Sequence, residues 1–206
     1  MRSSRPDAIS LAITGASGIA YALRLLECLI ETGQQVYVMI SPAGQMVAAM
    51  ESDVKLTGRA VDMQRQLAER FGAAPGQLAV FGNEQWTAPV ASGSGVPRAM
   101  VVCPCTTGTL AAIAVGTSDN LIERAADVVL KEQRKLILVP RETPFSVIHL
   151  ENMLRLARMG AVVLPANPGF YHHPERVEDL VDFVVARILD HLEIEHRLMP
   201  RWGIDK

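Results

Sequence analysis

The stretch AISLAITGASGIAYALRLLE, residues 8–27, decides the fold predicted for this chain of 206 residues. Residues 8–13 are almost all apolar and predict a buried strand, whereas residues 19–31 place apolar side chains at the spacing of an amphipathic helix. The residues between them, from Thr14 to Gly18, are small and predict a tight turn. A strand, a tight turn and a helix in this order predict a βα unit, the building block of a parallel sheet.

The same alternation continues along the chain and predicts an α/β fold with a doubly wound, mostly parallel sheet in a single domain, residues 1–206. Residues 58–95 are the least regular part, and we expect an excursion that carries a mobile loop rather than a second domain. A short C-terminal tail, residues 197–206, follows the last helix. The expected strands are residues 8–13, 36–40, 99–103, 136–139 and 161–164, and the expected helices are residues 19–31, 43–50, 60–71, 109–115, 121–131, 146–158 and 177–192.

The composition is that of a globular chain, with 49% hydrophobic and 20% charged residues. A net charge of −2 gives no reason to expect nonspecific binding to nucleic acid or membranes. The three cysteines, Cys28, Cys103 and Cys105, lack the spacing of a zinc site, so we expect buried reduced thiols and no metal. The apolar run after the basic N-terminus is interrupted at Thr14 and Gly15, too early for a signal peptide or a membrane span. We therefore expect a soluble, cytoplasmic protein.

Polar side chains follow every predicted strand. In open α/β sheets, ligands bind beyond the carboxyl ends of the strands, so these residues are the first candidates for a site. Together they offer hydroxyl groups, glycines, one cation and one carboxylate at the same edge of the sheet. They are Thr14, Gly15, Ala16, Ser17 and Gly18 after the first strand, Ser41 after the second, Thr106, Thr107, Gly108 and Thr109 after the third, Arg141 and Glu142 after the fourth, and Asn167, Gly169 and Tyr171 after the fifth.

Two of these turns are typical of anion binding. TGASG and TTGT each open a predicted helix, whose first N–H groups can bind a phosphate. A plain tight turn also explains TGASG, and an N-cap by Thr106 or Thr107 also explains TTGT. TGASG is not GxGxxG, and Ser41 stands where an NAD-binding chain carries an acidic residue, which argues against NAD.

Three cations lie on predicted helices. Arg124 and Lys131 are seven residues apart in LIERAADVVLKE, two helical turns on one face, where they flank an apolar strip. We expect both near the carboxyl edge of the sheet, although a solvated helix face is the common meaning of such charges. Arg187 lies within the last helix, and a surface arginine is its simplest interpretation.

Longer motifs carry a resemblance that covers residues 8–203. TGASGIAYALRLLE, CPCTTGTLAAIAVG, DNLIERAADVVLKE, LVPRETPFSVIHLENMLRLARMGAVVLPANPGFYHHP and LMPRWG closely resemble the UbiX-type flavin prenyltransferases. The resemblance implies a Rossmann-like, flavoprotein-type fold and a homo-oligomer, typically a dodecamer. It also implies transfer of a dimethylallyl group from dimethylallyl phosphate to N5 and C6 of reduced FMN, without a metal. The product, prenylated FMN, would then serve UbiD-type decarboxylases, including one in ubiquinone biosynthesis.

The resemblance also implies roles for individual residues. Thr106 stands where many members carry serine, and since the hydroxyl is kept we expect at most a small change in FMN affinity. Trp86 and Trp202 would line the prenyl pocket, although packing a loop and anchoring the C-terminus explain them equally simply. FMN would be held by Gly15, Ala16, Ser17, Ser41, Thr106, Thr107, Gly108, Thr109 and Arg141, the prenyl phosphate would be held by Arg124, Lys131, Tyr171 and Arg187, and Ser17, Glu51, Glu142, Lys131 and Arg124 would take part in catalysis.

The implied chemistry is consistent with these residue types. Dimethylallyl phosphate ionises without a metal only if cations absorb the charge of the departing phosphate, and arginine and lysine can do so. Glu142 can give a proton to that phosphate and later accept one from the flavin, while Ser17 can relay a proton at N5. An indole face stabilises a carbocation without capturing it.

Two other functions are compatible with this fold class. A flavin-dependent cysteine-peptide decarboxylase would need a histidine after the second strand, and none is present there. A non-catalytic flavin carrier would need the glycine and hydroxyl turns but not Glu142, Lys131 or Arg187. The residues leave open which decarboxylase receives the product, whether the donor is a monophosphate or a diphosphate, and the geometry of assembly.

Overall fold

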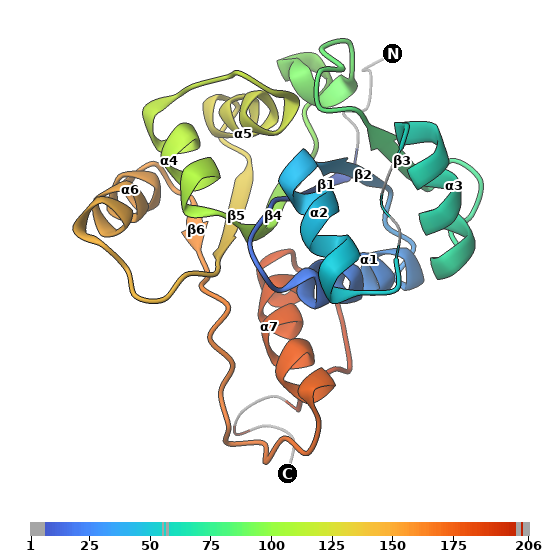
Figure 1. Cartoon of the computed structure of the whole chain (residues 1–206), viewed down its shortest axis with the longest axis vertical. Helices are drawn as coiled ribbons and strands as arrows, with labels where there is room; N and C mark the ends of the chain where they lie inside the picture. Colours follow the sequence, from blue (N-terminus) through green and yellow to red (C-terminus); the bar gives the residue numbers. More distant parts are fainter. Residues whose placement is uncertain (1–6, 55, 57, 201–202, 204–206) are drawn as a thin grey trace.

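Six parallel strands form one sheet in the computed structural model, which describes residues 7–54, 56, 58–200 and 203. The strand order is β3-β2-β1-β4-β5-β6, so the chain runs outward from β1 in one direction and from β4 in the other (Figure 1). This order confirms the doubly wound sheet, and β1 and β4 flank the point at which the order reverses. The strands are β1 (Ile9–Ile13), β2 (Val36–Ile40), β3 (Leu78–Phe81), β4 (Ala99–Cys105), β5 (Lys135–Pro140) and β6 (Val162–Val163).

Helices cover both faces of the sheet. Residues of α1, α3 and α7 share a core with one face, and residues of α4, α5 and α6 share a core with the other. Helix α2 lies beside α1, next to the carboxyl ends of β1 and β2 (Figure 1). The helices are α1 (Ile19–Glu31), α2 (Pro42–Glu51), α3 (Ala60–Phe71), α4 (Thr107–Val115), α5 (Leu121–Lys131), α6 (Val147–Arg158) and α7 (Val177–His191), with short 3-10 turns η1 (Pro89–Ala91) and η2 (Gly93–Gly95) before β4.

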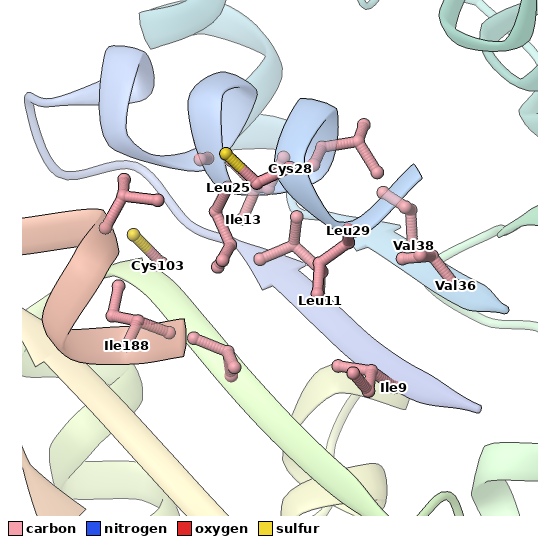
Figure 2. Packing of buried hydrophobic residues seen from close by; sticks show 14 of the residues in the cluster. Ile9, Leu11, Ile13, Leu25, Cys28, Leu29, Val36, Val38, Cys103 and Ile188 are labelled. Atoms are coloured by element: carbon pink, nitrogen blue, oxygen red, sulfur yellow. The ribbon is translucent and has the colours of Figure 1, made fainter. Parts of the chain in front are cut away.

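The central strands are buried on both faces, which explains why they are continuous apolar runs. In β1, Ile9, Leu11 and Ile13 belong to the core shared with α1 and α7 (Figure 2). Ala12, of the same strand, belongs to the opposite core. Burying one such aliphatic side chain contributes about 1.5–3 kcal/mol. Helix α1 packs on the face of β1 that carries the large side chains. The direction of the turn that joins β1 to α1 is fixed in this way.

The largest differences between the predicted and observed strands concern two of them, whereas β5 and β6 differ from the prediction by one residue at each end. The prediction missed β3, which lies within the expected excursion of residues 58–95 and pairs with β2 at the edge of the sheet. Strand β4 runs to Cys105, beyond the predicted end at residue 103. Proline usually ends a strand because it has no N–H, but here the pairing register shifts between Val102 and Cys105, so that the strand passes Pro104.

Candidate active site

The carboxyl ends of four neighbouring strands bring together the residues predicted to hold the flavin. Strand β1 pairs with β2 and β4, and β4 pairs with β5, so the turns that follow them are adjacent. Arg141, which follows β5, donates from Nε to the backbone oxygen of Ser17, which follows β1, at 3.2 Å. We call this group the carboxyl-edge cluster: Gly15, Ala16, Ser17, Ser41, Glu51, Thr106, Thr107, Gly108, Thr109, Arg141 and Glu142.

Glu51 completes the N-terminus of α1. Gly18 begins this helix in the left-handed region, with φ 114°, and has no side chain to cap it. Glu51 Oε2 accepts from the backbone nitrogens of Gly18, at 2.8 Å, and Ile19, at 3.1 Å. Burial acts to raise the pKa of Glu51, but hydrogen bonds from Ser17 and from these two N–H groups, with the charge of Arg141, outweigh it and lower the pKa. Glu51 therefore stands as a carboxylate against the TGASG turn.

The turn from β4 to α4 is held by hydroxyl groups. Thr106 Oγ1 accepts from Thr109 N at 3.0 Å, so the N-cap interpretation of Thr106 is confirmed. Thr106 N donates to Thr14 Oγ1 at 2.8 Å, and Thr14 Oγ1 donates to the backbone oxygen of Pro104 at 2.7 Å. Thr14 is only 2% exposed; the sequence placed it at this edge of the sheet but predicted no role for it. Its hydroxyl joins the end of β1 to the turn that carries the TTGT motif.

The carboxyl-edge cluster fits a phosphate monoester such as FMN. The first N–H groups of a helix lack intrahelical partners and attract an anion, and α4 begins within the TTGT motif. A Cβ added at Gly108 would meet only Thr106 Oγ1, at 3.9 Å, so a ligand can approach the backbone there. At Gly15 a Cβ would collide with Ala43, which shows how closely α2 packs on the TGASG turn. Exposed Arg141 adds a cation beside these donors.

Arg124 and Lys131, two of the residues predicted to bind the prenyl phosphate, lie on α5. Arg124 donates from Nε to the oxygen of Ala91, at 3.1 Å, and from Nη1 to Asp127, at 2.8 Å. Lys131 Nζ lies 2.8 Å from Oε1 of Glu132. A Cβ added at Gly93 would collide with Glu132 and meet Lys131 Nζ at 3.1 Å, so the glycine lets the ASGSG segment lie directly on this ion pair. We call Arg124, Lys131 and Glu132, with the ASGSG segment packed on them, the α5 cluster. Trp86 lies earlier on the same excursion and is 48% exposed.

The position of Lys131 corrects the sequence prediction. Lys131 is the last residue of α5, and Lys135 begins β5, so Lys131 lies at the amino edge of the sheet and not at the carboxyl edge. Arg141 follows the other end of the six residues of β5, which span about 20 Å. Figure 1 shows α5 and the start of α7 at opposite ends of the molecule. The reason is topological, because a helix that leads into a parallel strand delivers its last residue to that strand's amino end.

The remaining predicted residues gather around a third place, the tail cavity. This cavity, of about 890 Å³, lies between α7, the segment after β6 and the residues that follow α7. His172 stacks on Phe183, with ring centroids 5.7 Å apart, and Arg187 lies one helical turn after Phe183 on the same side of α7. Trp202 lies outside the described residues. The cavity is lined by Tyr171, His172, Phe183, Ala186, Arg187, Asp190, His196, Met199, Pro200 and Gly203.

Comparison with known proteins identifies the family. The family model described as Flavoprotein matches residues 1–189. The flavin prenyltransferase UbiX of Pseudomonas aeruginosa is 61% identical over 200 residues, which cover 97% of this chain and 96% of that protein. This chain belongs to the UbiX family of flavin prenyltransferases. The resemblance carried by the sequence motifs is therefore confirmed.

Solved structures of similar proteins agree with the UbiX assignment. A dodecameric FMN-dependent UbiX-like decarboxylase from Escherichia coli O157:H7 is 40% identical, with a TM-score of 0.85, over 95% of this chain and 99% of that one. AnUbiX (PadA1), in complex with FMN and dimethylallyl pyrophosphate, is 37% identical with a TM-score of 0.85, over 97% of this chain and 98% of that one. Both confirm the flavoprotein-type α/β fold.

Within this UbiX chain, the predicted residues form three groups and not one. The carboxyl-edge cluster, the α5 cluster and the tail cavity take their residues from different parts of the fold. No helix in the described part of the chain is both long enough and apolar enough to cross a bilayer. Among the same residues, no three or more His, Cys, Asp or Glu side chains are placed to hold a metal ion.

Proposed function

We propose that this chain transfers a dimethylallyl group from dimethylallyl phosphate to N5 and C6 of reduced FMN and releases prenylated FMN. The observation that carries this proposal is the 61% identity, over 97% of the chain, to a flavin prenyltransferase. The complex of AnUbiX (PadA1) with FMN and dimethylallyl pyrophosphate supports the pairing of the two ligands. Reduced FMN, when bound, supplies the two ring positions that are alkylated.

The carboxyl-edge cluster would hold the flavin. The N-terminus of α4 and Arg141 would bind its phosphate, and Ser41 would line the site beside them. Ser17 contacts both Glu51 and Arg141, and its hydroxyl would hold a proton near the flavin ring. The ionised carboxylate of Glu51 keeps the TGASG turn in the shape that presents Ser17.

The cations would hold the departing phosphate of the donor. Arg124, Lys131 and Arg187 provide three positive charges, which stabilise the negative charge that develops as the C–O bond breaks. Tyr171 adds a hydroxyl to this set. Glu142, half-buried beside Arg141, would donate a proton to the leaving phosphate oxygen and accept one back from the flavin. Removal of Lys131 or Arg187 would cost about 2–4 kcal/mol of transition-state stabilisation while FMN stays bound.

These cations can serve one phosphate only if several copies of the chain contribute to each site. Lys131 lies at the edge of the sheet opposite Arg141, so one subunit cannot place both on a ligand of this size. We therefore include in the proposal a homo-oligomer, a dodecamer like the Escherichia coli relative, whose sites are completed between subunits. The protein would work in the cytoplasm and supply a UbiD-type decarboxylase.

The direct test is an anaerobic reaction of the protein with reduced FMN and the donor, followed by mass spectrometry of the flavin. We expect a flavin heavier by one prenyl group, formed faster from the monophosphate than from the diphosphate. An unchanged flavin with both donors would refute the function. A flavin carrier without catalysis would give that unchanged flavin while still binding FMN.

Subunit mixing tests the shared site. Lys131→Ala and Glu142→Gln assemblies should each be nearly inactive. After dissociation and reassembly at equal amounts, about a quarter of the sites would combine an intact lysine with an intact glutamate from different subunits. Recovered activity near that fraction supports the shared site, and no recovery in mixed assemblies of the correct size would contradict it.

A further inference from the structure

Three side chains form a continuous set of contacts along one wall of the tail cavity. Arg187 Nη1 donates to Asp190 Oδ2 at 2.5 Å. The other carboxylate oxygen of Asp190, Oδ1, lies 3.2 Å from Nε2 of His196. A carboxylate can only accept, so Nε2 of His196 carries the proton and donates it. One carboxylate thus joins a cation of α7 to the segment that follows this helix.

Exposure differs sharply along this set. The Arg187 side chain is 54% exposed and that of Asp190 is 36% exposed, whereas that of His196 is only 12% exposed. An exposed ion pair three residues apart on a helix restrains an arginine weakly. The mostly buried histidine restrains the carboxylate, and through it the arginine. Within the described residues, Nδ1 of His196 is buried without a partner, so the contact with Asp190 is the polar contact that orients the ring.

We propose that His196 is a positioning residue for Arg187, acting through Asp190. The inference rests on the proposed function, which places Arg187 on the donor phosphate. A guanidinium group has five N–H donors in a planar fork, so an arginine held through Nη1 still presents its other donors to a phosphate. Fixing the fork in advance removes the entropy that a free arginine would lose when the phosphate binds.

The sign of the effect is clearest at His196. Without His196, Oδ1 of Asp190 is free, the guanidinium is less restrained, and the carboxylate competes with the phosphate for its donors. Both consequences weaken phosphate binding. At Asp190 the consequences oppose each other, because Asp190→Asn loosens Arg187 but also removes a negative charge near the phosphate. A change at His196 therefore reports on positioning, whereas a change at Asp190 mixes positioning with charge.

The test compares His196→Phe, which keeps a ring but has no donor, with His196→Gln, whose amide can replace Nε2–H. Dimethylallyl phosphate is titrated into protein loaded with oxidised FMN, so that binding is measured by calorimetry without turnover. We expect the Kd of the Phe variant to rise about three- to tenfold, with FMN affinity unchanged and the Gln variant close to wild type. His191→Phe, the same substitution on α7 outside the cavity lining, is the matched control.

A double-mutant comparison separates positioning from a general structural effect. In an Arg187→Ala background, His196→Phe should change neither the Kd of the donor nor its KM, because the residue through which it acts is absent. The same fold-change in both backgrounds, or no change in the wild-type background, overturns the inference. If the Phe variant does not assemble, His196→Asn, whose amide is too short to replace Nε2, takes its place. A wild-type protein that neither binds the donor nor prenylates FMN would refute the proposed function itself.

Discussion

Thr14→Val removes one hydroxyl and keeps the shape of the side chain. In the native chain this hydroxyl accepts from Thr106 N at 2.8 Å and donates to Pro104 O at 2.7 Å. Pro104 O keeps a second contact, from Thr14 N at 3.2 Å, so its loss is partial. Thr106 N loses its hydrogen bond to the hydroxyl of Thr14, a residue that is 2% exposed.

The loss of these contacts sets the expected decrease in the free energy of unfolding. The N–H of Thr106 is only part-buried, so leaving it without this acceptor should cost about 1 kcal/mol, the low end of the range for a buried group, and valine leaves no cavity that would add to this. The free energy of unfolding should fall by about that amount, which lowers Tm by about 2–4 °C for each kcal/mol in a chain of this size. FMN should also bind more weakly, because the turn that carries Thr106 and Thr109 is less fixed.

Two measurements check this prediction. Thermal unfolding is compared at one protein concentration, since assembly makes Tm depend on concentration, and FMN affinity is measured by quenching of flavin fluorescence. Thr14→Ser restores the hydroxyl and should recover most of the FMN affinity, even though it loses a buried methyl group. A Val variant with wild-type Tm and wild-type FMN affinity would show that this hydroxyl does not hold the turn.

Four further predictions concern other groups. Glu51→Gln should make the free energy of unfolding depend less on pH in the acid range. The folded-state pKa of Glu51 is lowered from 4.5, so in the wild type this group stabilises the fold above pH 4.5, and that contribution is lost as the pH falls through the folded-state pKa. Denaturant titrations from pH 3 to 7 measure the difference. Glu142→Gln should still bind FMN but form product slowly in the anaerobic assay, and a wild-type rate would exclude the acid–base role. Trp86→Phe should retain more prenyl transfer than Trp86→Leu, and equal rates would leave only a packing role. Burial raises the pKa of Cys28 to about 11 and that of Cys105 to about 12, so the thiols should react with a disulfide reagent at pH 8 only after unfolding.

Much of the fold could be predicted because local chemistry fixes where its elements begin and end. Helix α5 begins after Asn120, whose side chain accepts from Glu123 N at 3.1 Å, and its predicted bounds are those observed. Helix α3 also has the predicted bounds, and Gly72 in the left-handed conformation ends it. Strand β3 was missed because four residues at the sheet edge give too short a pattern, and its position is decided by pairing with β2.

In the candidate site, too, some features could be predicted from the sequence and others could not. Residues that directly follow a strand could be placed, because the carboxyl ends of parallel strands share one edge of the sheet. The support beneath them could not be predicted, since the contact of Glu51 with Gly18 joins residues 33 positions apart. The hydroxyl of Thr14 likewise reaches residues 90 or more positions away. The position of Thr14 at the end of the first strand was predicted, but its two contacts were not.

The position of Lys131 could not be predicted from the sequence. Its helix, its face and its apolar neighbours were predicted, yet the structure places it at the amino edge, because α5 must deliver the chain to the start of β5. If Lys131 binds the same phosphate as Glu142, the two residues must come from different subunits. The contacts of Lys131 within its own chain would then have a function. Glu132 and Gly93 then hold the ammonium group in place on the surface that one copy presents to another. On this account, Gly93→Ala, which would collide with Glu132, should impair prenyl transfer while FMN binding by the same chain is unchanged.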